Sequence, residues 1–261
     1  EMGLQPEHSH HESGPGQNEV CFRYAPAVKS ADNLNTFKSA VKAIAARNGL
    51  YASFMPKPLH DQSGNGLHVN MSLMRDGKNL FESPLTPDSE AGYFVAGILA
   101  HARELTAFCN PVPNSYARLG ANEAPLYISW SRQNRSQLVR LPSASGDLCR
   151  VELRGPDPAG NPYLVIGLIL AAGLDGIARK LPLAEPVNRN LFHPSAAAGL
   201  ESLPRTLREA ITVAAQSDFI AAELPLALQN KYFEYQTQLC HGYENAPDPA
   251  VWERTHGFLV I

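Results

Sequence analysis

The fold is decided by the stretch Lys57-Pro58-Leu59-His60-Asp61-Gln62-Ser63-Gly64-Asn65-Gly66-Leu67-His68-Val69-Asn70-Met71-Ser72, a glycine-bracketed loop that runs into an alternating strand carrying a histidine. The two glycines have no Cβ, so the loop backbone can approach a ligand closely. Alternate residues of a strand share a face, which places His68, Asn70 and Ser72 together. The stretch therefore predicts a ligand-binding loop that leads into a strand with a polar face.

Three further motifs surround this stretch in a fixed order. They are His10-His11-Glu12-Ser13-Gly14-Pro15-Gly16-Gln17-Asn18-Glu19 upstream, and Asn110-Pro111-Val112-Pro113-Asn114-Ser115-Tyr116 and Arg150-Val151-Glu152-Leu153-Arg154-Gly155-Pro156-Asp157-Pro158 downstream. Each motif has its own pattern of glycine, proline and charge. One such motif alone would be a weak match, whereas four in order are specific.

Together these motifs resemble the catalytic domain of glutamine synthetase, the ATP-dependent ligase that joins ammonia to the side-chain carboxylate of glutamate. The resemblance covers nearly the whole chain. It implies an α+β fold in which curved antiparallel strands are backed by helices, as in the glutamine synthetase and guanido kinase catalytic domains. It also implies ATP as co-substrate, Mg²⁺ or Mn²⁺ as cofactor, glutamate and ammonia or another amine as substrates, and a homo-oligomer.

The composition is typical of one compact enzyme domain. The chain has 261 residues, 44% of them hydrophobic, so we expect a single domain over residues 1–261. A formal charge of -3 and a pI near 6.3 give no reason to expect nucleic acid or an anionic membrane as partner. The four cysteines lack C-x-x-C spacing, which favours reduced thiols and a cytoplasmic location.

The beginning of the chain suggests that part of the family's architecture is absent. Gly3 lies where a helix C-terminal cap would, so Glu1–Leu4 is interpreted as the end of a helix. Family members begin with a small β-grasp domain that supplies part of each active site, followed by a strand with further metal-binding glutamates. Because neither precedes Glu1, we expect an N-terminally truncated catalytic domain with weak or no turnover alone.

Periodicity predicts five helices and six strands. The helices are expected over Asp32–Arg47, Glu90–Phe108, Asn161–Lys180, Ser202–Gln216 and Pro225–Cys240. The strands are expected over Gln5–His11, Asn18–Tyr24, Tyr51–Met55, Leu67–Leu73, Tyr127–Ser131 and Leu148–Arg154. The apolar run Pro162–Leu181 contains Asp175 and Arg179, which favours a buried helix over a membrane span.

Glu12, Glu19, His68 and Glu152 are the candidate metal ligands. Three carboxylates and one imidazole form a hard donor set that favours magnesium or manganese over zinc. The resemblance implies that Glu12 and Glu19 hold the ion nearer glutamate, and that His68 and Glu152 hold the ion nearer the ATP phosphates. A zinc hydrolase is disfavoured because the chain has no H-E-x-x-H motif.

Arginines are concentrated between residues 118 and 154 of the chain: Arg118, Arg132, Arg135, Arg140, Arg150 and Arg154. Phosphoryl transfer needs cations around the migrating group, and guanidinium matches both phosphate and carboxylate. The resemblance implies that Arg118 binds the carboxylate end of glutamate and that Arg154 faces the γ-carboxylate. Arg135 and Arg140 would reach the phosphates and Arg150 the nucleotide, while Arg132 is interpreted as a surface residue.

The resemblance assigns roles to several uncharged or acidic positions as well. Gly64 belongs to the loop that holds the glutamate amino group, and Asn70 and Ser72 lie on the nucleotide side. Glu123 matches the flap carboxylate that accepts a proton as the amide forms. The chain departs from the commonest pattern at Ser63, where asparagine is usual, at Asn70, where a second histidine is usual, and before Glu123, where the loop is one residue shorter.

The regulatory tyrosine of some family members corresponds to Phe192, which has no hydroxyl to modify, so adenylylation at this position is not expected.

Three alternatives to an ammonia ligase remain open from the sequence. A ligase that joins glutamate to a polyamine or another amine would share every motif. A non-catalytic relative would keep the fold and bind nucleotide. A phosphotransferase acting on guanidino compounds would use an amine as phosphoryl acceptor, although the glycine loop and Arg154 favour a carboxylate.

Overall fold

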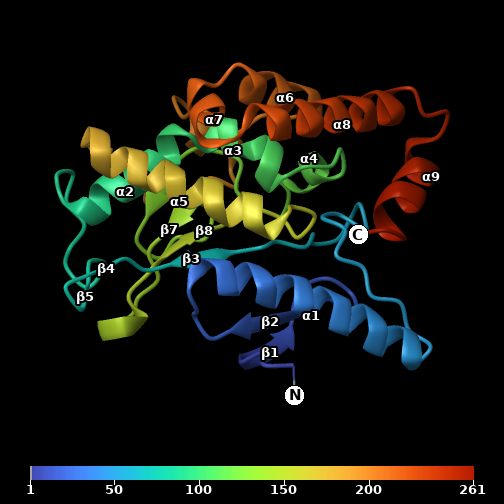
Figure 1. The fold of residues 1–261 in the computed structure, drawn as a ribbon, viewed down its shortest axis with the longest axis horizontal. Helices are drawn as coiled ribbons and strands as arrows, with labels where there is room; N and C mark the ends of the chain where they lie inside the picture. The colour runs from blue at the N-terminus through green and yellow to red at the C-terminus, as the bar shows by residue number, and fades with distance from the viewer. Residues whose placement is uncertain (1) are drawn as a thin grey trace.

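The structure, a computed structural model, describes residues 2–261 except for the side chain of Pro194, and its elements lie in stacked layers (Figure 1). The central sheet has four strands in the order β3-β8-β7-β6. Their bounds are Val69–Met71 for β3, Trp130–Ser131 for β6, Val139–Arg140 for β7 and Val151–Leu153 for β8. The β3–β8 and β8–β7 pairs are antiparallel, whereas β7 and β6 run parallel.

Helices cover one side of this sheet in two layers, and a hairpin with one long helix lies on the other side (Figure 1). The inner layer holds α2 (Glu90–Ala100), α3 (Ala102–Cys109) and α5 (Pro162–Arg179); the outer layer holds α6 (Leu207–Ala215), α7 (Asp218–Glu223) and α8 (Leu226–Glu244). On the far side lie β1 (Pro6–His11), β2 (Asn18–Phe22) and α1 (Ala27–Arg47).

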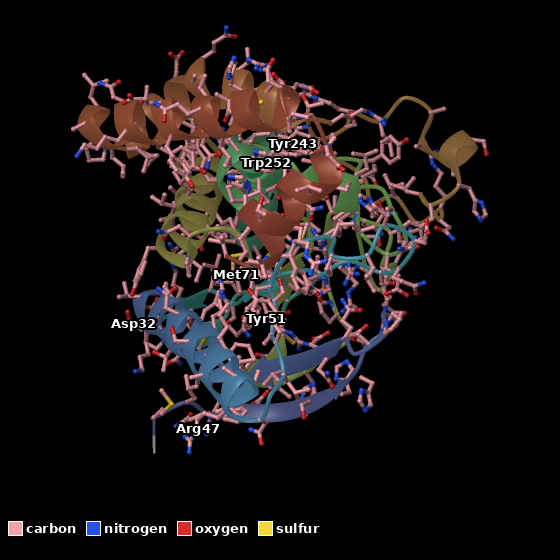
Figure 2. All side chains as sticks on the ribbon, turned by 90° about the vertical axis from the view of Figure 1, so that its right-hand side faces the viewer. Asp32, Arg47, Tyr51, Met71, Tyr243 and Trp252 are labelled. Atoms are coloured by element: carbon pink, nitrogen blue, oxygen red, sulfur yellow. The ribbon has the colours of Figure 1, made fainter. Side chains whose placement is uncertain are left out.

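Short elements complete the chain. They are the β4–β5 hairpin (Met74–Arg75 and Lys78–Asn79), α4 (Ser115–Arg118), α9 (Pro249–Glu253), 3-10 turns at Gly146–Leu148 and Pro194–Ala197, and a π-helical turn at Arg254–Phe258. Tyr243 and Trp252 lie close together where α8 is followed by α9, with ring centroids 5.3 Å apart (Figure 2). This contact holds the last helix against the body of the molecule.

The strands of the central sheet are apolar on one face only. Val139 and Val151 are 0% exposed and Leu153 is 4% exposed, and all three belong to the core formed with α2, α3 and α5. Side chains alternate between faces along a strand, so the residues between these apolar positions must point to the opposite side. That opposite side faces the β1–β2 hairpin.

Glycines set the distance between α2 and α5. Gly97 and Gly176 lie backbone to backbone, because a Cβ built on Gly97 would be 2.8 Å from the Gly176 Cα. Both helices begin with a side-chain cap: Ser89 accepts from the Gly92 amide in α2, and Asn161 accepts from two first-turn amides in α5. The close crossing lets the two helices cover the sheet together.

α5 satisfies the length and composition of a membrane span, but one of its faces is buried in the core. Val165, Ile169 and Ala172 are 0% exposed, and the helix packs along α2. The helix expected over Asn161–Lys180 is therefore present as a core helix.

The four cysteines are free thiols, three of them buried.

The helix expected over Glu90–Phe108 is divided at His101 into α2 and α3. The His101 ring bonds Asp175 of α5 at 2.8 Å, also contacts Glu104, and stacks on Phe219 with centroids 4.0 Å apart. These tertiary contacts interrupt the helix at His101, although the helical spacing of apolar residues continues past this position in the sequence. Elsewhere the helices extend beyond the expected bounds, with α1 beginning at Ala27 and α8 ending at Glu244, while α6 begins only at Leu207.

The prediction of a strand over Tyr51–Met55 is wrong, because this segment pairs with no strand in the described part of the chain. Its aromatic residues are used for packing instead: Tyr51 stacks on Phe258 at 5.2 Å and Phe54 packs edge-on against Phe37 at 6.0 Å. The strands within Leu67–Leu73, Tyr127–Ser131 and Leu148–Arg154 are shorter than expected. Glu1–Leu4 was expected to be the end of a helix. Glu1 lies outside the described residues, and Met2–Leu4 form no helix.

A Cβ at the α2–α5 crossing should destabilise the fold. In Gly97→Ala it would lie 2.1 Å from the Ala172 carbonyl oxygen, and in Gly176→Ala 2.1 Å from the Tyr93 carbonyl oxygen. We expect each change to lower the free energy of unfolding by about 1–3 kcal/mol, measured by urea denaturation.

Gly167→Ala is the matched control on α5, because a Cβ there meets nothing within 4 Å. This change should raise the free energy of unfolding by about 0.5–1 kcal/mol, since alanine favours the helix. Similar destabilisation by all three changes would contradict the proposed close crossing.

Candidate active site

The β1–β2 hairpin has one apolar face and one face of possible metal ligands. Phe22 packs edge-on against Phe37 of α1 with centroids 5.0 Å apart. On the opposite face the register pairs His10 with Glu19, and Glu12 follows two residues after His10. His10 Nε2 lies 2.9 Å from Glu12 Oε1 and 3.7 Å from Glu19 Oε2. One possible ligand atom from each of the three residues lies within 4.8 Å of the others, so the hairpin alone gathers a compact candidate metal site.

The pKa of Glu19 reflects this environment. Burial raises the pKa, but the hydrogen bond that Glu19 accepts from the Cys21 thiol, its hydrogen bond with Glu12 and the charges of His68 and His10 together outweigh burial and lower it overall. Cys21 Sγ lies 3.2 Å from Glu19 Oε1. Glu19 is therefore a carboxylate at neutral pH, which is the form that binds a cation.

The central sheet gathers the second group of charges by its register. Asn70 of β3 pairs with Glu152 of β8, and Glu152 pairs with Arg140 of β7, so these three side chains share the face opposite the apolar core. His68 and Arg154 lie two residues away on the same face by strand alternation. The structure thus brings together four of the sequence-predicted charged residues: His68, Arg140, Glu152 and Arg154.

Glu152 is the centre of this group. Its Oε2 accepts from Arg140 Nε at 2.5 Å and from Arg154 Nη1 at 3.3 Å, and its Oε1 lies 3.4 Å from His68 Nδ1. Burial raises the pKa of Glu152, but hydrogen bonds from His68 and Arg140 and the charges of His68 and Arg154 lower it well below its usual value. A nearly buried carboxylate in this setting stays ionised.

The hairpin cluster and the sheet face oppose each other. Gln17, in the turn between β1 and β2, donates from Nε2 to the Gly64 carbonyl and to Asn65 Oδ1, both at 2.9 Å. His68 contributes to the lowered pKa of Glu19, and Arg150 partly offsets the raised pKa of Cys21. The turn of the hairpin is therefore joined to the glycine loop, and the charge of His68 acts on Glu19.

The glycine loop packs against Arg118. A Cβ on Gly64 would lie 2.4 Å from the Pro56 carbonyl oxygen and 3.1 Å from Arg118 Cγ, and one on Gly66 would lie 2.6 Å from Arg118 Nη2. Only glycine permits this approach. Arg118 is 3% exposed and donates to the carbonyl oxygens of Gly155 at 2.8 Å and Arg154 at 3.2 Å.

The charge of Asp157 acts on this arginine, and Asp157 was not among the sequence-predicted site residues. Burial raises its pKa, while Arg118 and hydrogen bonds from Asn110 and Ser115 act in the opposite direction without overcoming it. Burial in turn lowers the pKa of Arg118 to about 10, with Asp157 opposing and Arg154 reinforcing the change. Asn110 Nδ2 also bonds the Gly155 carbonyl, so the Asn110–Tyr116 and Arg150–Pro158 motifs interlock.

Four predicted residues lie at the edge of this arrangement. Arg150 donates from Nε to Asn70 Oδ1 at 3.0 Å. Ser72 is exposed one residue past β3, and Glu123 is exposed in a turn after Asn122, whose backbone is left-handed with φ 52°. The Arg135 side chain is also exposed, and Arg154 contacts its backbone carbonyl at 3.1 Å. Among the described residues, the side chains of Ser72, Glu123 and Arg135 form no hydrogen bond or ion pair with the central charges; only the Arg135 backbone reaches them, through Arg154.

An open hollow of about 650 Å³ lies beside Arg150. It is lined by Gln5, Pro6, Glu7, Arg23, Tyr24, Asp147 and Leu148, and Arg150 Nη1 donates to the Leu148 carbonyl at 3.0 Å. Tyr24 is 66% exposed there. None of the lining residues was predicted as part of a site, and an exposed tyrosine beyond the end of a strand gives no distinctive sequence signal.

The donor atoms fit divalent cations. The hairpin supplies two carboxylates and one imidazole, a set suited to magnesium or manganese, and the His68–Glu152 pair adds a nitrogen and an oxygen that face each other. His10 is not among the candidate metal ligands that the sequence pattern indicates, yet it lies with Glu12 and Glu19. Strand alternation between His10 and Glu12 is the signal that would have identified it.

The low pKa of Glu152 has a consequence for stability. A carboxyl whose pKa is lower when folded stabilises the protein above its unfolded pKa, about 4.3 for glutamate, and loses that stabilisation as pH falls toward the folded value. We expect metal-free protein to lose free energy of unfolding in urea as pH falls from about 5 to 3. Glu152→Gln should flatten this dependence, and an unchanged slope in the variant would contradict the role of Glu152.

Comparison with known proteins identifies the family. The family model described as the catalytic domain of glutamine synthetase matches residues 1–255. The chain is 51% identical over 231 residues to a glutamine synthetase of Methanosarcina mazei. This alignment covers 85% of this chain and 52% of the relative. It is 46% identical over 240 residues to a glutamine synthetase of Staphylococcus aureus, covering 89% of this chain and 54% of the relative. The chain thus spans about half the length of the curated relatives it matches.

Solved structures agree in fold. GmaS in an ADP complex has a TM-score of 0.86 and 35% identity, covering 98% of this chain and 60% of that chain. GmaS without ligand also has a TM-score of 0.86, with 36% identity, covering 97% of this chain and 59% of that chain. From the family match over nearly its whole length and this structural similarity, the chain belongs to the glutamine synthetase family and adopts the α+β fold of that family's catalytic domain.

Proposed function

We propose that the chain is the catalytic part of an ATP-dependent ligase that forms glutamine from glutamate and ammonia through a γ-glutamyl phosphate. The observation that carries this proposal is the pair of opposed charge groups. The hairpin cluster of His10, Glu12 and Glu19 faces a sheet surface on which Glu152 lies between Arg140 and Arg154. Such a space suits an anionic phosphate chain with divalent ions on one side and guanidinium groups on the other.

Nucleotide binding is assigned to the side of the site near Arg150. The hollow beside this arginine would receive the adenosine, with Tyr24 offering an aromatic face, while the phosphates extend toward Arg140. Asn70, Ser72 and Arg135 belong to this nucleotide side in the proposal. The similarity to GmaS, whose structure was solved with ADP, supports nucleotide binding at this fold.

Glutamate is assigned to the glycine loop and its arginines. The Gly64 backbone would receive the amino group, Arg118 the carboxylate end, and Arg154 the γ-carboxylate. Arg154 is 4% exposed, and bonds to Glu152 and to the Arg135 carbonyl hold its guanidinium in one orientation. A fixed guanidinium can orient a carboxylate for attack without further reorganisation.

Two steps follow from this placement. A γ-carboxylate oxygen attacks the terminal phosphorus and ADP leaves, giving an acyl phosphate; ammonia then attacks the acyl carbon and inorganic phosphate leaves. Mg²⁺ or Mn²⁺, held by Glu12, Glu19, His68 and Glu152, would neutralise charge on the phosphates. Arg140 stabilises charge on the transferred group, and Glu123 is proposed to accept the proton that the attacking nitrogen loses.

The amine acceptor has one specific competitor. GmaS is a γ-glutamylmethylamide synthetase, which makes methylamine a second candidate acceptor for this chain. The curated relatives with the higher identities, 51% and 46%, are glutamine synthetases, and this similarity favours ammonia. A cytoplasmic location and a homo-oligomer of the longer protein are part of the same proposal.

Calorimetric titration of a non-hydrolysable ATP analogue tests the nucleotide and metal assignments. With Mn²⁺ present we expect saturable binding that tightens with glutamate by about 5-fold or more, the usual range for coupled ligands. Glu152→Ala should abolish this binding, because it removes a ligand and leaves Arg140 and Arg154 without their carboxylate.

Arg132→Ala is the matched control, since Arg132 is exposed outside the site. It should bind like the wild type. Absence of Mn²⁺-dependent binding in both this chain and the longer natural protein would contradict the proposed function and favour a non-catalytic relative.

The acceptor assignment is tested in the longer natural protein by comparing kcat/KM for ammonia and methylamine. We expect ammonia to be preferred, with inorganic phosphate released in equal amount to the amide. Preference for methylamine would move the assignment to a γ-glutamyl amide ligase, and phosphorylation of creatine or arginine without amide formation would overturn the ligase reaction itself.

A further inference from the structure

The β1–β2 hairpin is attached to the rest of the molecule at its two ends rather than along its length. Among residues 2–261 its strands pair only with each other. Near its open end, Phe22 packs on Phe37 of α1. At its turn, the side chain of Gln17 reaches the glycine loop. The metal-binding face of the hairpin lies between these two attachments.

Gln17 uses both ends of its amide in this attachment. Its Oε1 accepts from the Gly14 amide at 3.0 Å, which fixes the side chain on its own turn. Its Nε2 donates to the Gly64 carbonyl and to Asn65 Oδ1, each at 2.9 Å, across a separation of 47 and 48 residues. One half-buried amide therefore connects the turn between Glu12 and Glu19 to the loop before His68.

The loop that receives these bonds is itself rigid. Asn65 donates from its backbone amide to the Pro56 carbonyl at 2.7 Å and from Nδ2 to the Met55 carbonyl at 2.8 Å. The Gly64 backbone lies against Pro56 and Arg118. A shift of Gln17 would be passed to the backbone that the proposed function assigns to the glutamate amino group.

We propose that Gln17 is a positioning residue that couples the metal cluster of the hairpin to the glutamate-binding glycine loop. The inference rests on the proposed function. Metal bound by Glu12 and Glu19 draws the hairpin into one position, and Gln17 then holds the Gly64–Asn65 backbone in the conformation that receives glutamate. Binding coupling is reciprocal, so glutamate strengthens metal binding by the same factor through the same contact.

Gly14 supports this inference independently. A Cβ at Gly14 would lie 2.9 Å from Gln17 Oε1 and 3.3 Å from Gln17 Cβ, so the buried glycine leaves the space in which the amide lies. Gly14→Ala would displace the Gln17 side chain without changing its chemistry. Gly14→Ala and a substitution of Gln17 itself should therefore weaken the same coupling.

The test measures Mn²⁺ affinity of this chain by electron paramagnetic resonance, with and without saturating glutamate. In the wild type we expect glutamate to lower the Mn²⁺ dissociation constant by about 5-fold or more. Gln17→Met keeps the side-chain length but removes every hydrogen bond, and Gln17→Glu keeps the acceptor for Gly14 but removes both donors. In each, and in Gly14→Ala, glutamate should change the constant by less than about 2-fold.

Asn18→Ala is the matched control, because Asn18 is the first residue of β2, next to Gln17, and its side chain bonds only the Gly16 carbonyl among the described residues. It should keep the wild-type coupling. The Mn²⁺ dissociation constant without glutamate should stay within about 3-fold in every variant, since coupling is a separate free energy from affinity at one site. If Gln17 had only a structural role, its substitution would weaken Mn²⁺ binding equally with and without glutamate, and it would lower the melting temperature.

The outcomes are distinguishable. Wild-type coupling that survives in Gln17→Met, Gln17→Glu and Gly14→Ala overturns the role of Gln17 and leaves the proposed function standing. No glutamate effect on Mn²⁺ binding in the wild type overturns the proposed function and this inference with it. Loss of coupling in the three variants with retention in Asn18→Ala supports the inference.

Discussion

The register that places Asn70 beside Glu152 and Glu152 beside Arg140 is the constraint on which the rest of the molecule depends. Strand alternation gives the central sheet one apolar face for the helices and one charged face. A shift of one residue would exchange the two, burying Glu152 among α2, α3 and α5 and exposing Val151. The core and the active site are therefore fixed by the same hydrogen-bond ladder.

The charged face is costly to form, and its arrangement reduces that cost. Glu152 and Arg154 are 5% and 4% exposed, and an unpaired charge at such burial would be strongly destabilising. Glu152 accepts from two arginines and contacts His68, so the buried charges are matched in sign and in hydrogen bonds. The same matching holds the guanidinium groups ready for an anionic substrate, which links local stability to the proposed phosphoryl transfer.

The hairpin is built differently from the sheet it faces. It brings three candidate metal ligands together by local pairing, yet its position relative to the sheet depends on the Phe22–Phe37 contact and on the bonds of Gln17. A rigid sheet and a hairpin attached at two points form a site whose two halves can respond to each other.

The sequence by itself determined the family and the α+β class and indicated the residues of a candidate site, because glycine spacing and strand alternation are local properties that four motifs display in order. It located most helices for the same reason, since the 3.6-residue period of α1 and α5 is read along the chain. It placed a strand at Tyr51–Met55 that does not exist, because the alternation of aromatic residues there serves packing on Phe37 and Phe258.

Only the tertiary structure decided which residues meet. The break at His101 follows from bonds to Asp175 and stacking on Phe219, contacts that no local pattern displays. The influence of Asp157 on Arg118 and the contact of Gln17 with Gly64 join residues 39 and 47 positions apart. Burial and distance decide such contacts, and both are properties of the packed chain rather than of any segment within it.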